Sequence, residues 1–287
     1  MGHPPLGSLG RFLYTQNPFY LISCFLMIYG LQLGAASYGG DFFFRSVFLT
    51  FSLVAYTALM VVTAIGVIRL GKVWQDARSI LLVVVIGQIA LSVGLDEYCV
   101  IDWNMASGML MFGAVFSIAA TELILRACRM RFPSWYRISF YLLLLCFFAA
   151  PIALGYAVRE NHLRLANWGA PLFSTAIAGG LLLLAPAVRR GAALVQDNGT
   201  PWDWPLYPLS AFVILAVVAM IRAHAIWMSF GFLGMPVQFE PFLLMPIALA
   251  GLVLVVESDG TKTTGRTHGA MGFAPALLAC SFSRQGM

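Results

Sequence analysis

Charge is scarce in this sequence of 287 residues, and that scarcity indicates the solvent in which the chain folds. Only 10% of the residues are Asp, Glu, Lys or Arg, whereas 60% are hydrophobic. The apolar residues stand in long blocks and lack the alternation that is typical of a half-buried soluble segment. What lies between the blocks is too short for a water-soluble domain of ordinary size. The composition therefore excludes a soluble globular protein and predicts a membrane protein.

Cysteine and histidine are also few, which limits the chemistry of the chain. The five cysteines show no C-x-x-C spacing, so neither a disulfide framework nor a zinc site is indicated. No G-x-S-x-G, H-E-x-x-H or Walker loop is present. His224 is the only histidine inside an apolar segment, whereas membrane haem commonly needs two axial histidines. We expect no metal and no cofactor.

The apolar blocks have the length of membrane-spanning helices. About 20 apolar residues are needed to cross a hydrocarbon core of ~30 Å. Eight segments qualify: 18–38, 46–68, 79–95, 104–126, 137–156, 168–188, 207–230 and 241–257. We expect an all-α polytopic transmembrane bundle of about eight spanning helices over residues 18–257. Residues 1–17 would be a cytoplasmic N-terminus, and residues 258–287 a flexible cytoplasmic tail. This tail does not continue the pattern of long apolar segments, which is compatible with a truncated C-terminus.

Lysine and arginine concentrate in alternate loops between these segments. The basic loops carry Arg69, Lys72, Arg78, Arg126, Arg129, Arg131, Arg137, Arg189 and Arg190, and the intervening loops only Arg45, Arg159 and Arg164. Because basic loops stay in the cytoplasm, this distribution predicts that both termini are cytoplasmic. It also explains the net charge of +5 without nucleic acid. The expected partners are the lipid bilayer and other membrane subunits.

Polar side chains at membrane depth are costly and are usually either paired or functional. Gln88 is predicted to form a hydrogen bond between helices. Glu122 precedes Arg126 by four residues, the order that favours an ion pair on one helix face, although a proton or cation role is the alternative. Glu257 closes the last apolar segment and is expected to be solvated.

Three carboxylates lie close together on the predicted outer side, after the third segment. Asp96, Glu97 and Asp102 are separated by Tyr98 and Cys99, with no basic residue among them. Such a group could bind a divalent cation through oxygen ligands, although no EF-hand spacing is present. Its other predicted role is to supply counter-ions for positive charge in the outer half of the bundle.

Arg222 is the positive charge that needs such a counter-ion. A rise of ~1.5 Å per residue places it about 22 Å into the ~30 Å core, in the outer third. From there it can reach water, Asp96, Glu97 or Glu240. His224 is two positions further on and therefore points to nearly the opposite side of the helix. A joint Arg222–His224 pair is not expected.

The outer side also permits a catalytic interpretation. A cysteine nucleophile needs a base and a stabilising cation, and Cys99, Arg159 or Arg164, and His224 or His162 all fall there. That layout distantly resembles the exosortase group of eight-helix membrane transpeptidases. The resemblance implies an active site of Cys, Arg and His on the outer face. The sequence departs from that group because no Cys-Gly motif follows Cys99.

Three other stretches resemble a group of uncharacterised multi-pass inner-membrane proteins of planctomycete-type bacteria. They are NPFYLISCFLMIYGL (17–31), DARSILLVVVIGQIALSVGLDE (76–97) and NGTPWDWPLYP (198–208), and the similarity would cover residues 11–257. The resemblance implies a bacterial inner membrane but no activity. We therefore expect a non-catalytic permease-like, sensory or scaffold component with an outward-facing polar site around Arg222, Asp96 and Glu97. The alternative is an outer-face enzyme that uses Cys99 and His224.

Overall fold

The computed structural model describes residues 18–37, 41–96, 98–202, 209–231 and 241–259. The expected N-terminal segment 1–17 lies outside these residues, as do residues 260–287 of the expected tail. Two of the acidic candidates, Glu97 and Glu240, also lie outside them.

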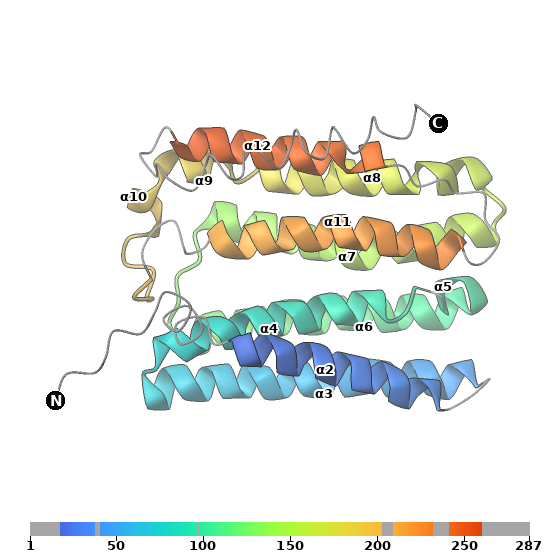
Figure 1. The fold of residues 1–287 in the computed structure, drawn as a ribbon, viewed down its shortest axis with the longest axis horizontal. Helices are drawn as coiled ribbons and strands as arrows, with labels where there is room; N and C mark the ends of the chain where they lie inside the picture. The colour runs from blue at the N-terminus through green and yellow to red at the C-terminus, as the bar shows by residue number, and fades with distance from the viewer. Residues whose placement is uncertain (1–17, 38–40, 97, 203–208, 232–240, 260–287) are drawn as a thin grey trace. The chain divides into compact units, whose positions relative to one another are not determined.

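Every regular element in the described part of the chain is a helix (Figure 1). The elements are α2 (Pro18–Ala36), α3 (Phe42–Gly66), the π-helical turn η1 (Val67–Gly71), α4 (Trp74–Val93), α5 (Tyr98–Ile101), α6 (Trp103–Ala127), α7 (Ser134–Arg159), α8 (Leu163–Leu182), α9 (Ala185–Arg190), α10 (Ala192–Val195), α11 (Leu209–Gly231), η2 (Pro241–Leu244) and α12 (Met245–Asp259). Each of the eight apolar segments of the sequence overlaps at least one of these helices. The all-α prediction is confirmed for these residues.

Within the described ranges, five helical stretches are long and apolar enough to cross a membrane. They are Phe42–Gly71, Asp76–Ile101, Trp103–Ala127, Ser134–Arg159 and Arg164–Arg190. Three further apolar stretches are described, Ile22–Ala36 in α2, Leu215–Ile226 in α11 and Met245–Leu254 in α12. Since such lengths match the thickness of a bilayer, these helices place the protein in a membrane.

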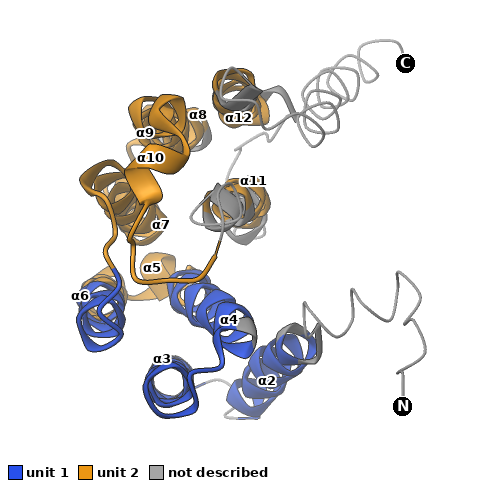
Figure 2. Ribbon diagram, turned by 90° about the vertical axis from the view of Figure 1, so that its left-hand side faces the viewer, with its two compact units in different colours: residues 1–94, 115–130 blue, residues 95–114, 131–287 orange. Residues whose placement is uncertain are grey.

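The helices group into two compact units, coloured separately in Figure 2. Unit 1 comprises residues 1–94 and 115–130, and unit 2 comprises residues 95–114 and 131–287. Helix α6 contributes its first half to unit 2 and its second half to unit 1. Each unit has its own packing, so each is described by itself.

Unit 1 is held together by polar contacts between apolar helices. The buried Gln88 of α4 donates its Nε2–H to the carbonyl oxygen of Ser117 at 3.0 Å and to Oγ1 of Thr121 at 3.1 Å, both on α6. The interhelical role predicted for Gln88 is thereby confirmed. Beside it, Gly87 lets Thr57 of α3 approach closely, because a Cβ on Gly87 would lie 2.5 Å from Oγ1 of Thr57. Small residues at such crossings bring helix backbones together where no hydrophobic effect drives association.

Unit 2 is organised around α8, which packs against α7, α11 and α12. Aromatic side chains fill the spaces between these helices. The rings of Tyr136 and Phe212 lie 5.7 Å apart between α7 and α11, and those of Phe147 and Phe173 lie 5.9 Å apart between α7 and α8. All four side chains are buried. Rings at this separation stabilise helix contacts beyond the area that they bury.

Two polar contacts join the loop ends of unit 2. Arg189 at the end of α9 forms a bidentate ion pair with Glu257 of α12, with nitrogen–oxygen distances of 2.7 and 2.6 Å. The expectation that Glu257 is merely solvated is wrong. In addition, the N–H of Arg131 donates to the carbonyl oxygen of Asn198 at 2.8 Å. The basic loops before α7 and after α9 therefore meet at one end of this unit.

Helix α5 packs tightly against α7 at Gly155. A Cβ on Gly155 would lie 2.6 Å from the carbonyl oxygen of Cys99 and 2.8 Å from its Cβ. Both distances are shorter than carbon can tolerate, and the first involves backbone that cannot rotate away. Glycine at this position lets α5 lie directly on α7.

This contact predicts a sharp difference between two glycines of the helices. Gly155→Ala should lower the free energy of unfolding by about 1–3 kcal/mol, because the added methyl overpacks the contact with α5. Gly179→Ala on α8 is the matched control, since a Cβ there meets nothing within 4 Å. Thermal unfolding in detergent micelles, followed by circular dichroism, measures both. Equal stability of the two variants would contradict the close packing of α5 on α7.

Candidate functional site

Arg222 occupies a core position on α11. The buried positions of this helix are Phe212, Leu215, Ala219, Arg222, Ala223 and Ile226, which follow helical spacing, whereas Val213, Val217 and Ile221 on the other side are exposed. Of the buried α11 side chains that the structure describes, all but Arg222 are apolar. Among the described residues, Arg222 is the largest side chain that is fully buried, with 1% of its surface exposed.

The guanidinium of Arg222 is neutralised by Asp96, which lies in the turn before α5. Nη2 donates to Oδ1 of Asp96 at 2.6 Å, and Nη1 donates to Oδ2. This bidentate arrangement aligns the planar fork of arginine with both carboxylate oxygens. Asp96 is itself only 2% exposed. Both charges are therefore removed from solvent and each depends on the other.

The position of Asp96 is set by the tight packing of α5. The backbone carbonyl of Asp96 accepts a hydrogen bond from the N–H of Cys99 at 3.2 Å, and Cys99 is pressed against Gly155 of α7. Cys99 is fully buried and lies near enough to Asp96 and Arg222 to interact electrostatically with both. The chain Gly155, Cys99, Asp96 thus holds the carboxylate where α11 presents its arginine.

Of the acidic groups considered for Arg222, the structure brings Asp96 to it. Glu97 and Glu240 lie outside the described residues. Asp102 is exposed and accepts a hydrogen bond from the N–H of Met105 at 3.2 Å, so it acts as a cap for the start of α6. Among the described residues, no group of three His, Cys, Asp or Glu side chains could hold a metal ion.

His224 lies on a different side of α11 from Arg222. Arg222 is buried, whereas His224 is exposed, as the two-residue separation predicts. Cys99, the other residue of the catalytic interpretation, has no exposed surface. A thiol inside the packed helices and an imidazole on an exposed helix face do not form a nucleophile–base pair in this arrangement.

The remaining candidate, Glu122, lies near the end of α6 in unit 1. Its carboxylate is 3.7 Å from Nε of Arg126, one helical turn further on. The arginine side chain is 81% exposed, so water screens the interaction strongly. The contact is a surface ion pair of the kind that contributes a few tenths of a kcal/mol.

The Arg189–Glu257 contact was not predicted from the sequence. Both residues follow apolar helices on the side predicted to be cytoplasmic, so the signal was present in the sequence. Their pairing depends on α9 and α12 being neighbours, which loop charges do not reveal. This ion pair stabilises a helix end, whereas Arg222–Asp96 places charge inside the helical core.

The chemistry open to the Arg222–Asp96 pair is binding. An arginine fork recognises carboxylate or phosphate oxygens in the same bidentate manner as it holds Asp96. A buried pair of this kind seldom increases stability over well-packed apolar residues, which makes a pure packing role a poor explanation for its presence. A charged side chain inside the membrane is costly in free energy, so its presence also indicates a functional site.

Removal of one charge from the pair should be much more harmful than removal of both. Arg222→Met leaves the carboxylate of Asp96 buried without its counter-ion, and should lower the free energy of unfolding by about 3–5 kcal/mol. The double variant Arg222→Met/Asp96→Leu should recover most of that loss, because apolar residues of similar volume replace the pair. Chemical unfolding in micelles measures the series.

The exposed pair of unit 1 supplies the control for this series. Arg126→Gln should change the same free energy by only a few tenths of a kcal/mol. A double variant as unstable as Arg222→Met would show that the pair is not an independent two-charge unit.

Known proteins give no further indication of what the Arg222–Asp96 pair does. No protein-family model, no curated protein and no solved structure matches the chain. The functional proposals therefore rest on the buried charges of unit 2 and on the apolar surfaces of the spanning helices.

Proposed function

We propose that the chain is a non-catalytic, permease-like component of a bacterial inner membrane, with the Arg222–Asp96 pair as its polar site. The observation that carries the proposal is the bidentate contact between two charges that are 1% and 2% exposed within an apolar bundle. In this state Asp96 acts as a resident counter-ion. A small carboxylate or phosphate solute would compete with it for the guanidinium.

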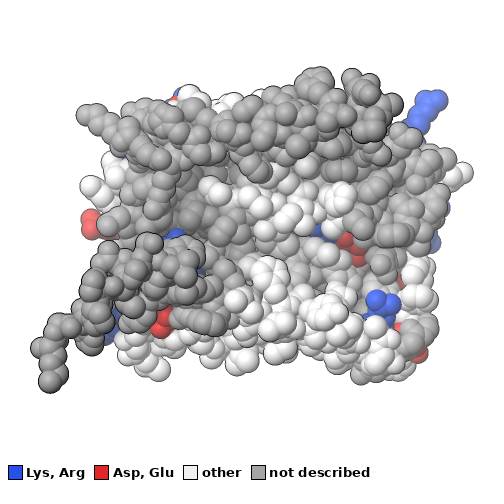
Figure 3. Space-filling view, viewed as in Figure 1, with Lys and Arg blue, Asp and Glu red and all other residues white. Residues whose placement is uncertain are grey.

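The membrane setting is supported by the surface of the helices. Large apolar side chains such as Leu59, Val62 and Val115 are more than half exposed, which water would not tolerate over so many residues. On the face shown in Figure 3, most of the described surface carries neither Lys, Arg, Asp nor Glu. Such an uncharged surface fits contact with the hydrocarbon of a bilayer.

Eight crossings with both termini in the cytoplasm are part of the proposal. The five candidate spans and the three further apolar stretches overlap the eight segments of the sequence. Within each unit, basic residues of the proposed cytoplasmic loops meet at helix ends. Arg69 donates to the carbonyl of Ala127 in unit 1, and Arg131 contacts Asn198 in unit 2. These contacts support the arrangement because they join loops that the charge distribution assigns to one side.

The burial of Cys99 favours this proposal over the outer-face enzyme. A reactive cysteine needs access to substrate and a stabilised thiolate, and the described packing gives the thiol of Cys99 no exposed surface. The catalytic interpretation would require the contact between Cys99 and Gly155 to open.

Accessibility of engineered cysteines in intact cells tests the orientation. Glu160→Cys, between α7 and α8, should react with a membrane-impermeant maleimide from outside, and Gln196→Cys only after permeabilisation. Both positions are exposed. The native Cys128 should add little background, because it is buried and burial raises its pKa, an effect that Arg69 partly offsets. Labelling of Gln196→Cys in intact cells would overturn the proposed topology.

Rescue of a damaged site by small anions tests the polar site itself. Asp96→Asn removes the counter-ion of Arg222, and formate or inorganic phosphate should restore part of the lost thermal stability by occupying the fork of the guanidinium. The measurement is the melting temperature in micelles at constant ionic strength. The double variant Arg222→Met/Asp96→Leu is the control that should not respond. The wild type should respond less than Asp96→Asn, because Asp96 already holds the guanidinium and a solute must displace it. Absence of rescue would mean that solutes do not reach Arg222, and it would contradict the proposal that the Arg222–Asp96 pair is a solute-binding site.

A further inference from the structure

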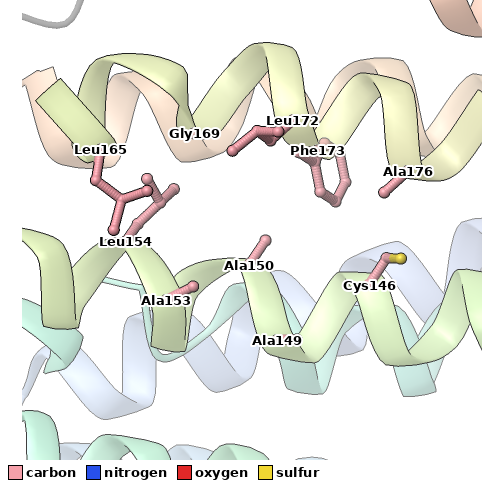
Figure 4. Close-up of a pocket in the computed structure, with 10 residues that line it drawn as sticks. All are labelled: Cys146, Ala149, Ala150, Ala153, Leu154, Leu165, Gly169, Leu172, Phe173 and Ala176. Atoms are coloured by element: carbon pink, nitrogen blue, oxygen red, sulfur yellow. The ribbon is translucent and has the colours of Figure 1, made fainter.

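The helices α7 and α8 enclose an apolar groove on the surface of unit 2. It has a volume of about 230 Å³, and every side chain that lines it is apolar or a cysteine (Figure 4). Its walls include the small residues Ala149, Ala150 and Ala153 of α7 and Gly169 and Ala176 of α8. Sites for polar small molecules carry a few well-placed polar groups, and this groove offers none. Its chemistry fits a hydrocarbon.

The length of the groove matches one leaflet of a bilayer. Figure 4 shows Leu154 and Leu165 at one end and Cys146 and Ala176 at the other. At ~1.5 Å per residue, the lining spans about 12 Å along α7 and about 16 Å along α8. This is roughly half of a ~30 Å hydrocarbon core. The groove therefore runs from the loop end of the two helices to the region of the bilayer midplane, the depth that one lipid chain occupies.

Two arginines lie at the loop end of the groove. Arg164 is exposed and directly precedes Leu165, and Arg159 ends α7 about 7.5 Å of helix beyond Leu154. The Arg159 guanidinium lies 5.9 Å from the ring centre of Trp103 and 4.0 Å from the carboxylate of Glu160, and half of its side chain is exposed. Asp102, which precedes Trp103, is a second exposed carboxylate at this end. An anionic headgroup would therefore bind here through the two guanidinium groups.

We propose that this groove binds one acyl chain of an anionic phospholipid, with its phosphate held at Arg159 and Arg164. The groove opens to the lipid, because Leu165 is 48% and Leu172 is 54% exposed at its rim. Apolar lining selects the chain, and the two arginines select the charge of the headgroup. The groove contains neither Arg222 nor Asp96 and uses no buried charge. This proposal and the one on the Arg222–Asp96 pair can therefore fail independently.

Photolabelling of the full chain tests the site. The protein is reconstituted in phosphatidylcholine vesicles that contain a trace of phosphatidylglycerol with a diazirine near the end of one acyl chain. After irradiation, mass spectrometry of peptides should find the label concentrated at the end of the groove away from the loop, near Cys146, Phe173 and Ala176. The same diazirine on phosphatidylcholine should label this region less.

Variants that fill the groove should remove the label. Ala153→Phe and Ala176→Phe place a ring in the groove from opposite walls, and both alanines are exposed, so the core need not rearrange. Each should reduce labelling at least fivefold. Ala119→Phe, the same change at an exposed alanine of α6 away from the groove, should leave it unchanged. Two independent fillers keep the test decisive if one of them fails to fold.

The two arginines at the loop end of the groove are tested separately. Arg159→Gln and Arg164→Gln should each reduce the preference for phosphatidylglycerol over phosphatidylcholine about fivefold, as expected for one basic residue near an anionic headgroup. Three results would overturn the proposal. They are uniform labelling of all exposed helix faces, labelling that survives both filling variants, and crosslinks that join two copies of the chain at the groove.

Discussion

The apolar helices of unit 2 can bury an arginine only because the same unit supplies its counter-ion. An isolated charge at membrane depth costs several kcal/mol, so Arg222 on the core face of α11 requires Asp96 in reach. Asp96 is in reach because α5 lies on α7, and α5 lies there because Gly155 has no side chain. A single glycine, a short helix and one ion pair therefore form a connected constraint. It links α11 to α7 through α5, in addition to the direct packing of α11 on α8, α7 and α12.

Much of the helical pattern could be predicted from the sequence, because the length of an apolar segment is a local property. The opposite orientations of Arg222 and His224 followed from helix geometry alone. The partner of Arg222 did not, since Asp96, Glu97 and Glu240 were equivalent by charge and predicted side. The choice depends on how closely α5 approaches α7. Glu257 was misjudged for the same reason, because its pairing with Arg189 requires the spatial contact of α9 with α12.

The two polar clusters stabilise their units by different means. Gln88 of unit 1 is uncharged and joins α4 to α6 through the carbonyl of Ser117 and the hydroxyl of Thr121. Hydrogen bonds of this kind contribute about 0.6 kcal/mol on average between membrane helices, and the loss of one is tolerable. Arg222–Asp96 of unit 2 carries full charges and tolerates no such loss. We therefore expect an anionic solute to change the packing of unit 2, where it can compete with Asp96, and not the contacts of Gln88 in unit 1.

The ion pair also imposes an order on biosynthesis, because its two halves lie 126 residues apart in the chain. At ~5–20 residues per second, the ribosome completes α11 roughly 6 to 25 s after Asp96 has emerged. During that interval the carboxylate has no arginine to hold it and remains in the turn at the membrane boundary, where water can solvate it. Docking of α11 then withdraws both charges together. Docking of α11 is thus a late step in the assembly of unit 2, followed by that of α12. A nascent chain that stops before α11 retains Asp96 without Arg222.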